Sequence, residues 1–205
     1  PQGWVLATVG ELYKVLSGGT PSTKIEEYWD GDIPWITSAN IHGLKDIRPE
    51  RTVTKTGIKN SSTNLVPKGS IIVVTRVSLG KVALAETDLC FSQDSQALLP
   101  TDKVHHGYAL YYLSWAAREF QSKSRGTTIS GITKKQLLTL DFPLPPCPEQ
   151  ERIVAKIEEL FTQLEAGVAE LQRAKAQLQR YRQAVLKSAV EGELTREWRA
   201  AHQSE

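Results

Sequence analysis

The sequence predicts an α+β fold in which a globular domain over residues 1–148 is followed by a long, coiled-coil-forming α-helix over residues 149–190. Two observations support this division. Before Pro148, short apolar runs rich in β-branched residues alternate with Gly, Ser, Asn and Pro, a composition typical of strands joined by turns. After Pro148, apolar residues recur every seven positions with no further proline, which is typical of a coiled-coil helix. Residues 191–205 are predicted to form a tail.

The candidate strands of the globular domain are the apolar runs at residues 33–37, 69–77, 81–85 and 141–145. Residues 104–121 instead place aromatic and apolar side chains at helical spacing, which predicts an amphipathic helix with its aromatics in the core. Residues 133–140 predict a shorter helix, because Thr133 and Gln136 stand at the spacing of a capping box.

The long helix begins after a proline-rich segment, "LPPCP". Pro148 is suited to the first helical position, where its fixed φ and missing N–H carry no penalty. At about 1.5 Å per residue the helix would be on the order of 60 Å long, more than a domain of this size can cover. It therefore needs a second helix beside it. The residues predicted to pair are Ile153, Ile157, Leu160, Leu164, Leu171, Leu178, Tyr181 and Val185.

Charge along this helix indicates how it would pair. Residues 149–170 are rich in Glu, whereas residues 171–187 contain Lys and Arg and no acid. A like helix laid antiparallel sets the acidic half against the basic half, so antiparallel pairing is favoured. Gly167, at a pairing position, either permits close backbone approach or is a flaw that costs about 1 kcal/mol relative to Ala.

Composition limits the class of protein. The chain of 205 residues has a net charge of +2 and two cysteines, Cys90 and Cys147, too few for a disulfide framework or a four-cysteine zinc site. It contains neither an apolar stretch of the roughly 20 residues that span a membrane nor a secretory leader pattern. We expect a cytoplasmic protein without a membrane partner, and the absence of methionine suggests a piece of a longer chain.

Basic residues are unevenly distributed in the first region. The segment 51–85 contains Lys and Arg but no acid, and residues 103–140 are basic except for Glu119. Such segregation can form a basic face that attracts a polyanion, because neutralised phosphates release condensed counterions. A solvated lysine-rich surface is the alternative, and for a charge run alone it is the commoner one.

Motifs of catalysis, metal binding and cofactor binding are missing. Ser78 and Lys81 match a Ser-x-x-Lys pattern, but the companion motifs of Ser-Lys hydrolases are absent or in the wrong order. His105 and His106 are adjacent, so on a helix they point about 100° apart and cannot bind one metal ion as an i, i+4 pair can. We therefore predict no catalytic residue, no metal site and no cofactor.

Several motifs resemble one half of a type I restriction-modification specificity subunit. They are "SGGTPS" (17–22), "YWDGDIPWITSANI" (28–41), "TISGITKKQLLTLDFPLPP" and, most specifically, "LPPCPEQERIVAKIEELF" (144–161). The resemblance implies a target recognition domain for double-stranded DNA, followed by a spacer helix that packs antiparallel on a second one. It also implies partners: a methyltransferase (modification) subunit, a restriction subunit, and a second specificity half or a second copy of the chain. Residues 182–202 resemble the join between halves, so 191–205 would be an inter-half linker.

The resemblance, together with local chemistry, nominates DNA contacts. In "SGGTPS", glycines that allow unusual backbone angles stand among small donors, which suits a phosphate, although a tight turn without ligand is equally compatible. Asn40 could pair bidentately with adenine. The candidate DNA-binding residues are Ser17, Thr20, Ser22, Thr37, Ser38, Asn40, Arg76, Ser78, Lys81, Gln93, Arg125, Thr128 and Lys134. We expect Lys81 to contact phosphate, and Arg76 or Arg125 to contact a base.

A second hypothesis remains open on the residues alone. The chain could be a coiled-coil adaptor whose globular head binds another protein, with its basic segments serving solubility. Salt-dependent binding to a DNA duplex separates the two hypotheses, because phosphate contacts make affinity fall steeply with salt.

Overall fold

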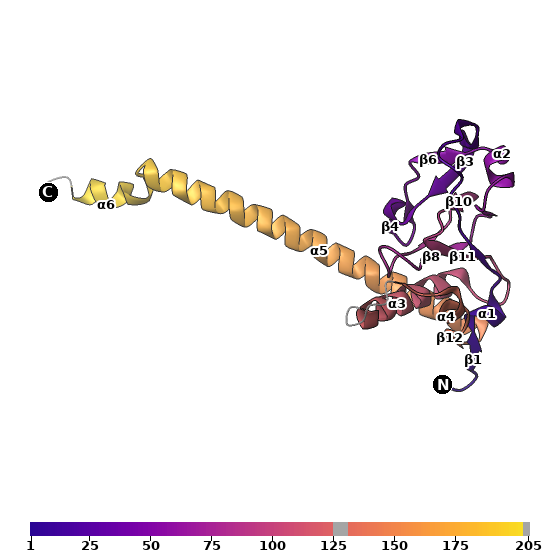
Figure 1. Ribbon diagram of the computed structural model, residues 1–205. Helices are drawn as coiled ribbons and strands as arrows, with labels where there is room; N and C mark the ends of the chain where they lie inside the picture. Colours follow the sequence, from indigo (N-terminus) through magenta and orange to yellow (C-terminus); the bar gives the residue numbers. More distant parts are fainter. Residues whose placement is uncertain (125–130, 203–205) are drawn as a thin grey trace. The chain divides into compact units, whose positions relative to one another are not determined.

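The computed structural model describes residues 1–124 and 131–202, drawn in Figure 1, and divides into two units, Pro1–Val154 and Ala155–Glu205. The boundary between the units falls within the long helix α5 (Cys147–Val190). The first unit contains strands and short helices, and the second contains most of α5 and a short C-terminal helix. The predicted α+β class and the long helix are confirmed.

Two four-stranded sheets form the centre of the first unit. One has the order β6 (Arg51–Val53), β3 (Trp29–Ile36), β10 (Leu89–Phe91) and β7 (Leu65–Val66), and only its β3–β10 pair is parallel. The other is antiparallel, in the order β2 (Val15–Ser17), β11 (Ser95–Leu98), β8 (Ile71–Val74) and β9 (Val82–Leu84). Two small antiparallel sheets pair β1 (Val5–Thr8) with β12 (Asp141–Leu144), and β4 (Ile41–Gly43) with β5 (Asp46–Ile47).

The helices of the first unit are short except for α3 (His106–Ser124). The others are α1 (Val9–Leu12), α2 (Lys55–Lys59), α4 (Lys134–Leu138) and the 3-10 turns η1 (Glu26–Tyr28) and η2 (Ser38–Asn40). The predicted capping box of α4 is present, since Thr133 Oγ1 accepts the N–H of Gln136 and Gln136 Oε1 accepts the N–H of Thr133. In the second unit, η3 (Glu193–Thr195) and α6 (Arg196–Ala201) follow α5.

Burial on both faces explains why the sequence of strand β8, "IIVV", is apolar throughout. Ile71 and Val73 belong to the core cluster that includes α3, whereas Ile72 and Val74 belong to a second cluster with β9, β10 and β11. Because successive side chains of a strand point to opposite faces, a strand buried on both faces has a continuous apolar run. The predicted strand at 69–77 ends early, at Val74, because the N–H groups of Thr75 and Arg76 both donate to Asp94 O.

The core beneath α3 consists of Leu110, Leu113 and Ala117 on the helix, packed with Phe142 of β12 and with β8. The prediction that all aromatic residues of this helix lie in the core is wrong for Trp115, which is 59% exposed. Tyr108 follows the prediction: it is buried, and its hydroxyl donates to Pro143 O at 2.7 Å.

The start of α5 is attached to the first unit by a buried glutamine. Gln150 is 1% exposed, its Oε1 accepts the N–H of His105 at 2.8 Å, and its Nε2 donates to Pro145 O at 2.8 Å. The helix begins at Cys147, one residue before the predicted Pro148. Val154 is buried and Ile153 packs against the same core cluster. Ile153 therefore contributes to the core of the first unit, and its part in helix pairing stays a prediction.

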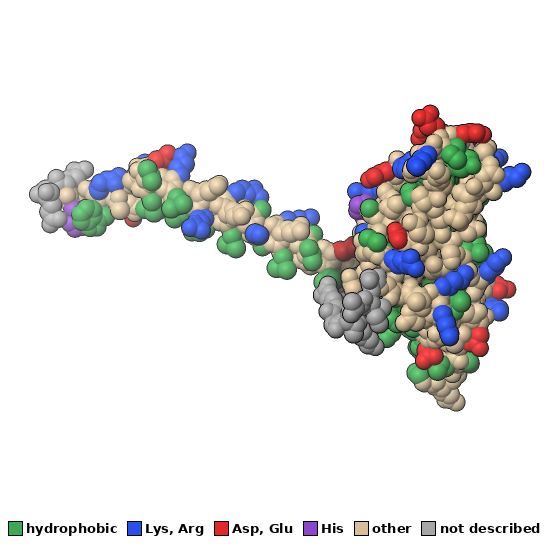
Figure 2. Space-filling view, viewed as in Figure 1, with side chains coloured by type: hydrophobic (Ala, Val, Ile, Leu, Met, Phe, Trp, Pro, Cys, Tyr) green, Lys and Arg blue, Asp and Glu red, His purple; other side chains and the backbone are tan. Residues whose placement is uncertain are grey.

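Farther along α5 the predicted pairing residues lie on the surface of the single chain. Leu164, Leu171, Leu178 and Tyr181 are between 63% and 72% exposed, Leu160 is half exposed, and Ile157 is partly buried. Figure 2 shows hydrophobic side chains along the length of the helix. A Cβ added at Gly167 would meet nothing within 4 Å. Exposed apolar surfaces of this kind are typical of interaction sites, and the pairing of this helix stays a prediction.

Candidate nucleic-acid interface

The parallel pair of strands β3 and β10 brings two predicted contact loops to one edge. Parallel strands end on the same side of their sheet, so the segments that follow Ile36 and Phe91 emerge together. The N–H of Ser92 donates to Ile36 O at 2.9 Å, which joins the two segments directly. Residues 37–40 and 92–94, far apart in the sequence, therefore occupy one site.

The "SGGTPS" loop is attached to this edge through its backbone. The N–H of Gly19 donates to Phe91 O at 2.9 Å, and the N–H of Gly18 donates to Ser95 O at 3.2 Å. From the other side, the indole N–H of Trp35 donates to Gly19 O at 3.0 Å, and that of Trp29 donates to Ser22 O at 3.1 Å.

Close packing explains the two glycines. A Cβ on Gly18 would lie 2.0 Å from Ser92 O, and one on Gly19 would lie 2.4 Å from Ser62 O. Neither glycine has the positive φ that would favour glycine for conformational reasons. The expectation of unusual backbone angles at these glycines is thus wrong, and they permit one backbone segment to lie against another.

The polar side chains of this loop divide into internal and exposed ones. The Ser17 hydroxyl donates a hydrogen bond to Oε1 of Gln96 at 2.9 Å. Because Gln96 is only 7% exposed, this pair lies inside the fold. Thr20 and Ser22 are exposed, and the Thr20 hydroxyl donates to Oε1 of Gln93, which is also exposed. Of the residues nominated in these two segments, Thr20, Ser22 and Gln93 can reach a ligand.

The turn after β3 has a structural function. Asn40 Oδ1 accepts from the N–H and the hydroxyl of Thr37 at 2.8 Å and 3.1 Å, which caps the 3-10 turn η2. Ser38 and Asn40 are each 5% exposed. The side-chain oxygen of Asn40 is thus used within the fold and both residues are buried, and their contacts with DNA stay predictions.

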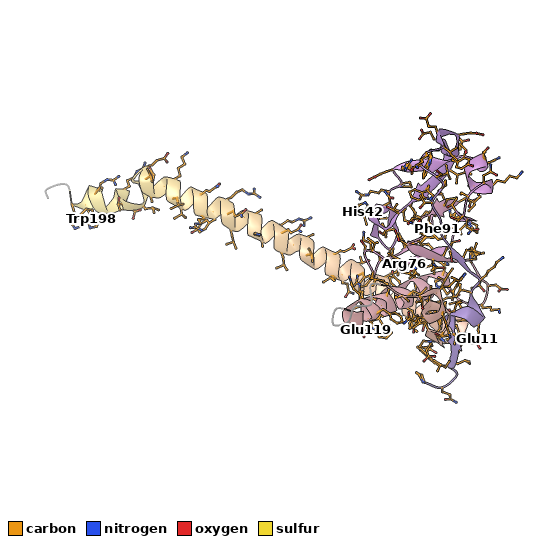
Figure 3. The ribbon with its side chains drawn as sticks, viewed as in Figure 1. Glu11, His42, Arg76, Phe91, Glu119 and Trp198 are labelled. Atoms are coloured by element: carbon orange, nitrogen blue, oxygen red, sulfur yellow. The ribbon has the colours of Figure 1, made fainter. Side chains whose placement is uncertain are left out.

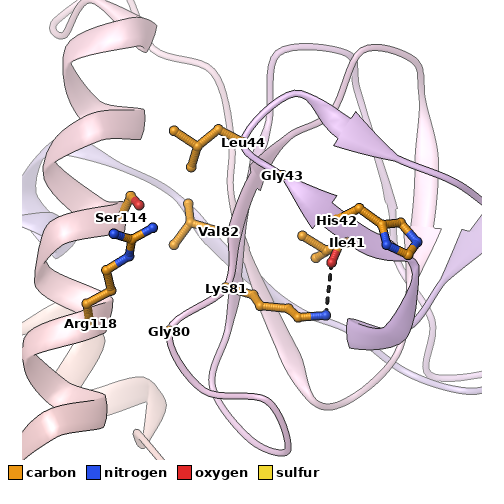
Figure 4. Close-up of a pocket in the computed structure, with 9 residues that line it drawn as sticks. All are labelled: Ile41, His42, Gly43, Leu44, Gly80, Lys81, Val82, Ser114 and Arg118. Atoms are coloured by element: carbon orange, nitrogen blue, oxygen red, sulfur yellow. Dashed lines mark hydrogen bonds between the residues drawn. The ribbon is translucent and has the colours of Figure 1, made fainter. Parts of the chain in front are cut away.

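Lys81 holds the same turn in place. Its ammonium group donates to Ser38 O at 2.8 Å and to Ile41 O at 2.9 Å. Two of its three donors are thus used within the fold, and its contact with phosphate stays a prediction. Beside it lies a pocket of about 210 Å³ whose lining includes His42, Ser114 and Arg118, as Figure 4 shows. Lys81 and Arg118 are the lysine and arginine of its lining, and the Lys81 ammonium is turned toward Ser38 O and Ile41 O. Arg118 belongs to the basic segment 103–140 noted in the sequence, whereas His42 was not singled out there.

The loop between β8 and β9 presents Arg76 and Ser78, both exposed. Its first residues are held by Asp94 O, which accepts the N–H groups of Thr75 and Arg76 at 2.8 Å and 3.0 Å. Arg76 also forms an isolated bridge with Gly131. In the view of Figure 3, Arg76 lies between His42 and Glu119.

The remaining nominated residues are less constrained. Lys134 is exposed and is the first residue of α4. Arg125 and Thr128 lie outside the described residues. On the face drawn in Figure 2, Lys and Arg side chains cluster over the middle of the first unit, with Asp and Glu among them and at its ends. The basic face inferred from residues 51–85 stays a prediction.

Cys90 is a buried thiol within the first unit. Burial raises the pKa of the Cys90 thiol to about 11, so this group stays protonated and is a poor nucleophile. Within residues 1–124 and 131–202, no cluster of His, Cys, Asp or Glu is suited to hold a metal ion. No helix in the same residues is long and apolar enough to cross a membrane.

Comparison with known proteins identifies the family. The family model for the type I restriction modification DNA specificity domain matches residues 1–173. The chain belongs to this family. The resemblance inferred from the sequence motifs is thereby confirmed, and the edge described above lies within the matched residues.

Two curated members of the family illustrate the degree of similarity. The specificity subunit of the type I restriction enzyme MjaIX from Methanocaldococcus jannaschii is 34% identical over 170 residues, which is 80% of this chain and 39% of that protein. The EcoKI specificity subunit from Escherichia coli is 27% identical over 208 residues, which is 97% of this chain and 45% of that protein.

A solved structure of the family has the same fold. The crystal structure of the HsdS subunit from Thermoanaerobacter tengcongensis has a TM-score of 0.69 and 27% identity, over 92% of this chain and 45% of that chain. The chain thus spans less than half the length of these relatives.

Proposed function

We propose that this chain is a non-catalytic DNA-specificity module that acts in the cytoplasm and reads one half of a bipartite target. The observation that supports this most directly is the convergence of loops from four parts of the sequence at one edge. Thr20, Ser22, Gln93 and Arg76 are exposed there, and the basic pocket beside Lys81 adjoins the same turn. Small polar groups and a guanidinium suit base edges and phosphates, while a basic pocket suits a phosphate.

Helix α5 supplies the second part of the proposal. Its exposed apolar residues, Leu164, Leu171 and Leu178 among them, pair with an equivalent helix in a second specificity half or a second copy of the chain. The acidic first half and basic second half favour an antiparallel arrangement. Such a pair would set two recognition domains apart as the readers of a split sequence, with methyltransferase and restriction subunits docked around them.

The experiment is to purify the chain with a candidate modification subunit and to sequence the sites that the complex methylates. A defined bipartite target is the expected result. Methylation without sequence preference would contradict the proposal.

Salt dependence tests the contact surface and separates this proposal from the adaptor hypothesis. Affinity for a duplex should fall steeply between low and moderate salt, and Arg76→Ala should either reduce the salt slope by about one unit or remove discrimination at one base position. Lys14→Ala removes the same charge from an exposed position outside the two basic segments and is the control. If neither the parent nor the variants bind DNA in a salt-dependent way, the adaptor hypothesis is favoured.

A further inference from the structure

The tip of the β8–β9 hairpin contains an exposed valine in a conformation that valine rarely adopts. Val77 has φ of 47° and is 64% exposed, and Ser78 after it has φ of 45°. Two successive positive φ angles at a hairpin tip are normally supplied by Asn-Gly or similar pairs. A β-branched residue at positive φ is a strained outlier. Single exposed apolar residues are common and need no explanation, but an exposed and strained one does.

The surrounding structure holds this tip in place. At the base of the loop the N–H of Val74 donates to Lys81 O at 3.0 Å, and Asp94 O accepts the N–H groups of Thr75 and Arg76. On the other strand, the Lys81 ammonium is anchored on Ser38 O and Ile41 O. Both ends of the loop are therefore joined to the edge where the contact loops converge, and the isopropyl group of Val77 is presented from a fixed base.

The neighbours of Val77 indicate what it contacts. Arg76 and Ser78 flank it, and both are exposed. A guanidinium binds phosphate or guanine, and a hydroxyl can donate or accept a hydrogen bond at a base edge. An apolar side chain contacts the C5-methyl group of thymine in the major groove. We propose that Val77 reads thymine at one position of the DNA target through this methyl group. The inference rests on the proposed function and names one specificity residue within it.

The test uses the full chain in complex with its modification subunit and two randomised duplex libraries. One library contains thymine, and the other contains deoxyuridine in its place, which lacks only the methyl group. Bound duplexes are sequenced for the parent, for Val77→Asn and for Val5→Asn. Val5 is the matched control, since it is 61% exposed, lies in strand β1 and is not at positive φ.

The parent and Val5→Asn should both select thymine at one position by about fourfold, the value expected for burial of one methyl-sized group. That preference should disappear in the deoxyuridine library and in Val77→Asn, while the other positions stay selected. Asn tolerates positive φ, so Val77→Asn should melt no lower than the parent. If it nevertheless unfolds, Val77→Gly, which removes the isopropyl group and suits a positive φ, should lose the preference, and a retained preference overturns the inference.

Two outcomes overturn the inference and leave the proposed function standing. In one, Val77→Asn and the parent select the same sequences. Val77 would then contact a protein partner or nothing at all, but not the DNA base. In the other, the parent keeps its preference in the deoxyuridine library, so the methyl group is not read. If the parent selects no sequence at all, the proposed function fails, and the inference fails with it.

Discussion

Gln150 offers the sharpest test of how the long helix is joined to the recognition domain. Replacement by Leu keeps the volume similar but removes the acceptor of the His105 N–H and the donor to Pro145 O. The side chain is 1% exposed, so water cannot easily replace either partner. The substitution leaves two buried groups unpaired at about 1–3 kcal/mol each, and burial of the leucine side chain offsets part of this total. We expect Gln150→Leu to lower the free energy of unfolding by about 2–4 kcal/mol.

Urea unfolding followed by tryptophan fluorescence measures this loss. Gln183→Leu, at an exposed position of the same helix, is the matched control and should change stability by less than about 0.5 kcal/mol. Equal stability of Gln150→Leu and the parent would refute the reasoning, because it would mean that the two hydrogen bonds contribute nothing.

Gln150→Glu adds a dependence on pH. The carboxylate can still accept the His105 N–H, but it faces Pro145 O without a donor unless it is protonated. Burial and this carbonyl both raise the pKa of the new carboxyl group in the folded state. The variant should therefore be closer to the parent in stability at low pH, and its deficit should grow as the pH rises through the ordinary range of a glutamate. A deficit independent of pH would contradict the assigned geometry.

Other predictions concern assembly, packing and chemistry. Leu164→Glu with Leu171→Glu should abolish self-association or pairing in sedimentation experiments while the circular dichroism of the first unit is retained, because charges at the exposed pairing positions cannot be buried. Gly19→Ala should lower the melting temperature, since its Cβ would lie 2.4 Å from backbone atoms, whereas Gly167→Ala should raise helix stability by about 1 kcal/mol, with open space around it. Arg76→Ala should weaken duplex binding more than Lys14→Ala does in fluorescence titrations. The purified chain alone should transfer no labelled methyl group to DNA, and transfer would show an active site that the residues do not suggest.

Local patterns were sufficient for much of the fold. The seven-residue repeat predicted α5, and its predicted end near Val190 agrees with the structure. The capping box at Thr133 and Gln136 predicted the start of α4, and the apolar run at 71–74 predicted β8. These features depend on residues within a few positions of one another, where spacing alone sets the geometry.

The functional meaning of individual polar residues could not be predicted in the same way. Asn40 and Lys81 look like surface contacts in the sequence, yet one caps a buried turn and the other binds carbonyl groups about forty positions away. Gln150 lies in the most specific motif of the chain, but its partner His105 is 45 positions distant. Val77 carried no signal, because its strain depends on the backbone angle that the anchored loop imposes. Periodicity and capping are local properties of a sequence, whereas burial, hydrogen-bond partners and strain are set by which distant segments the fold brings together.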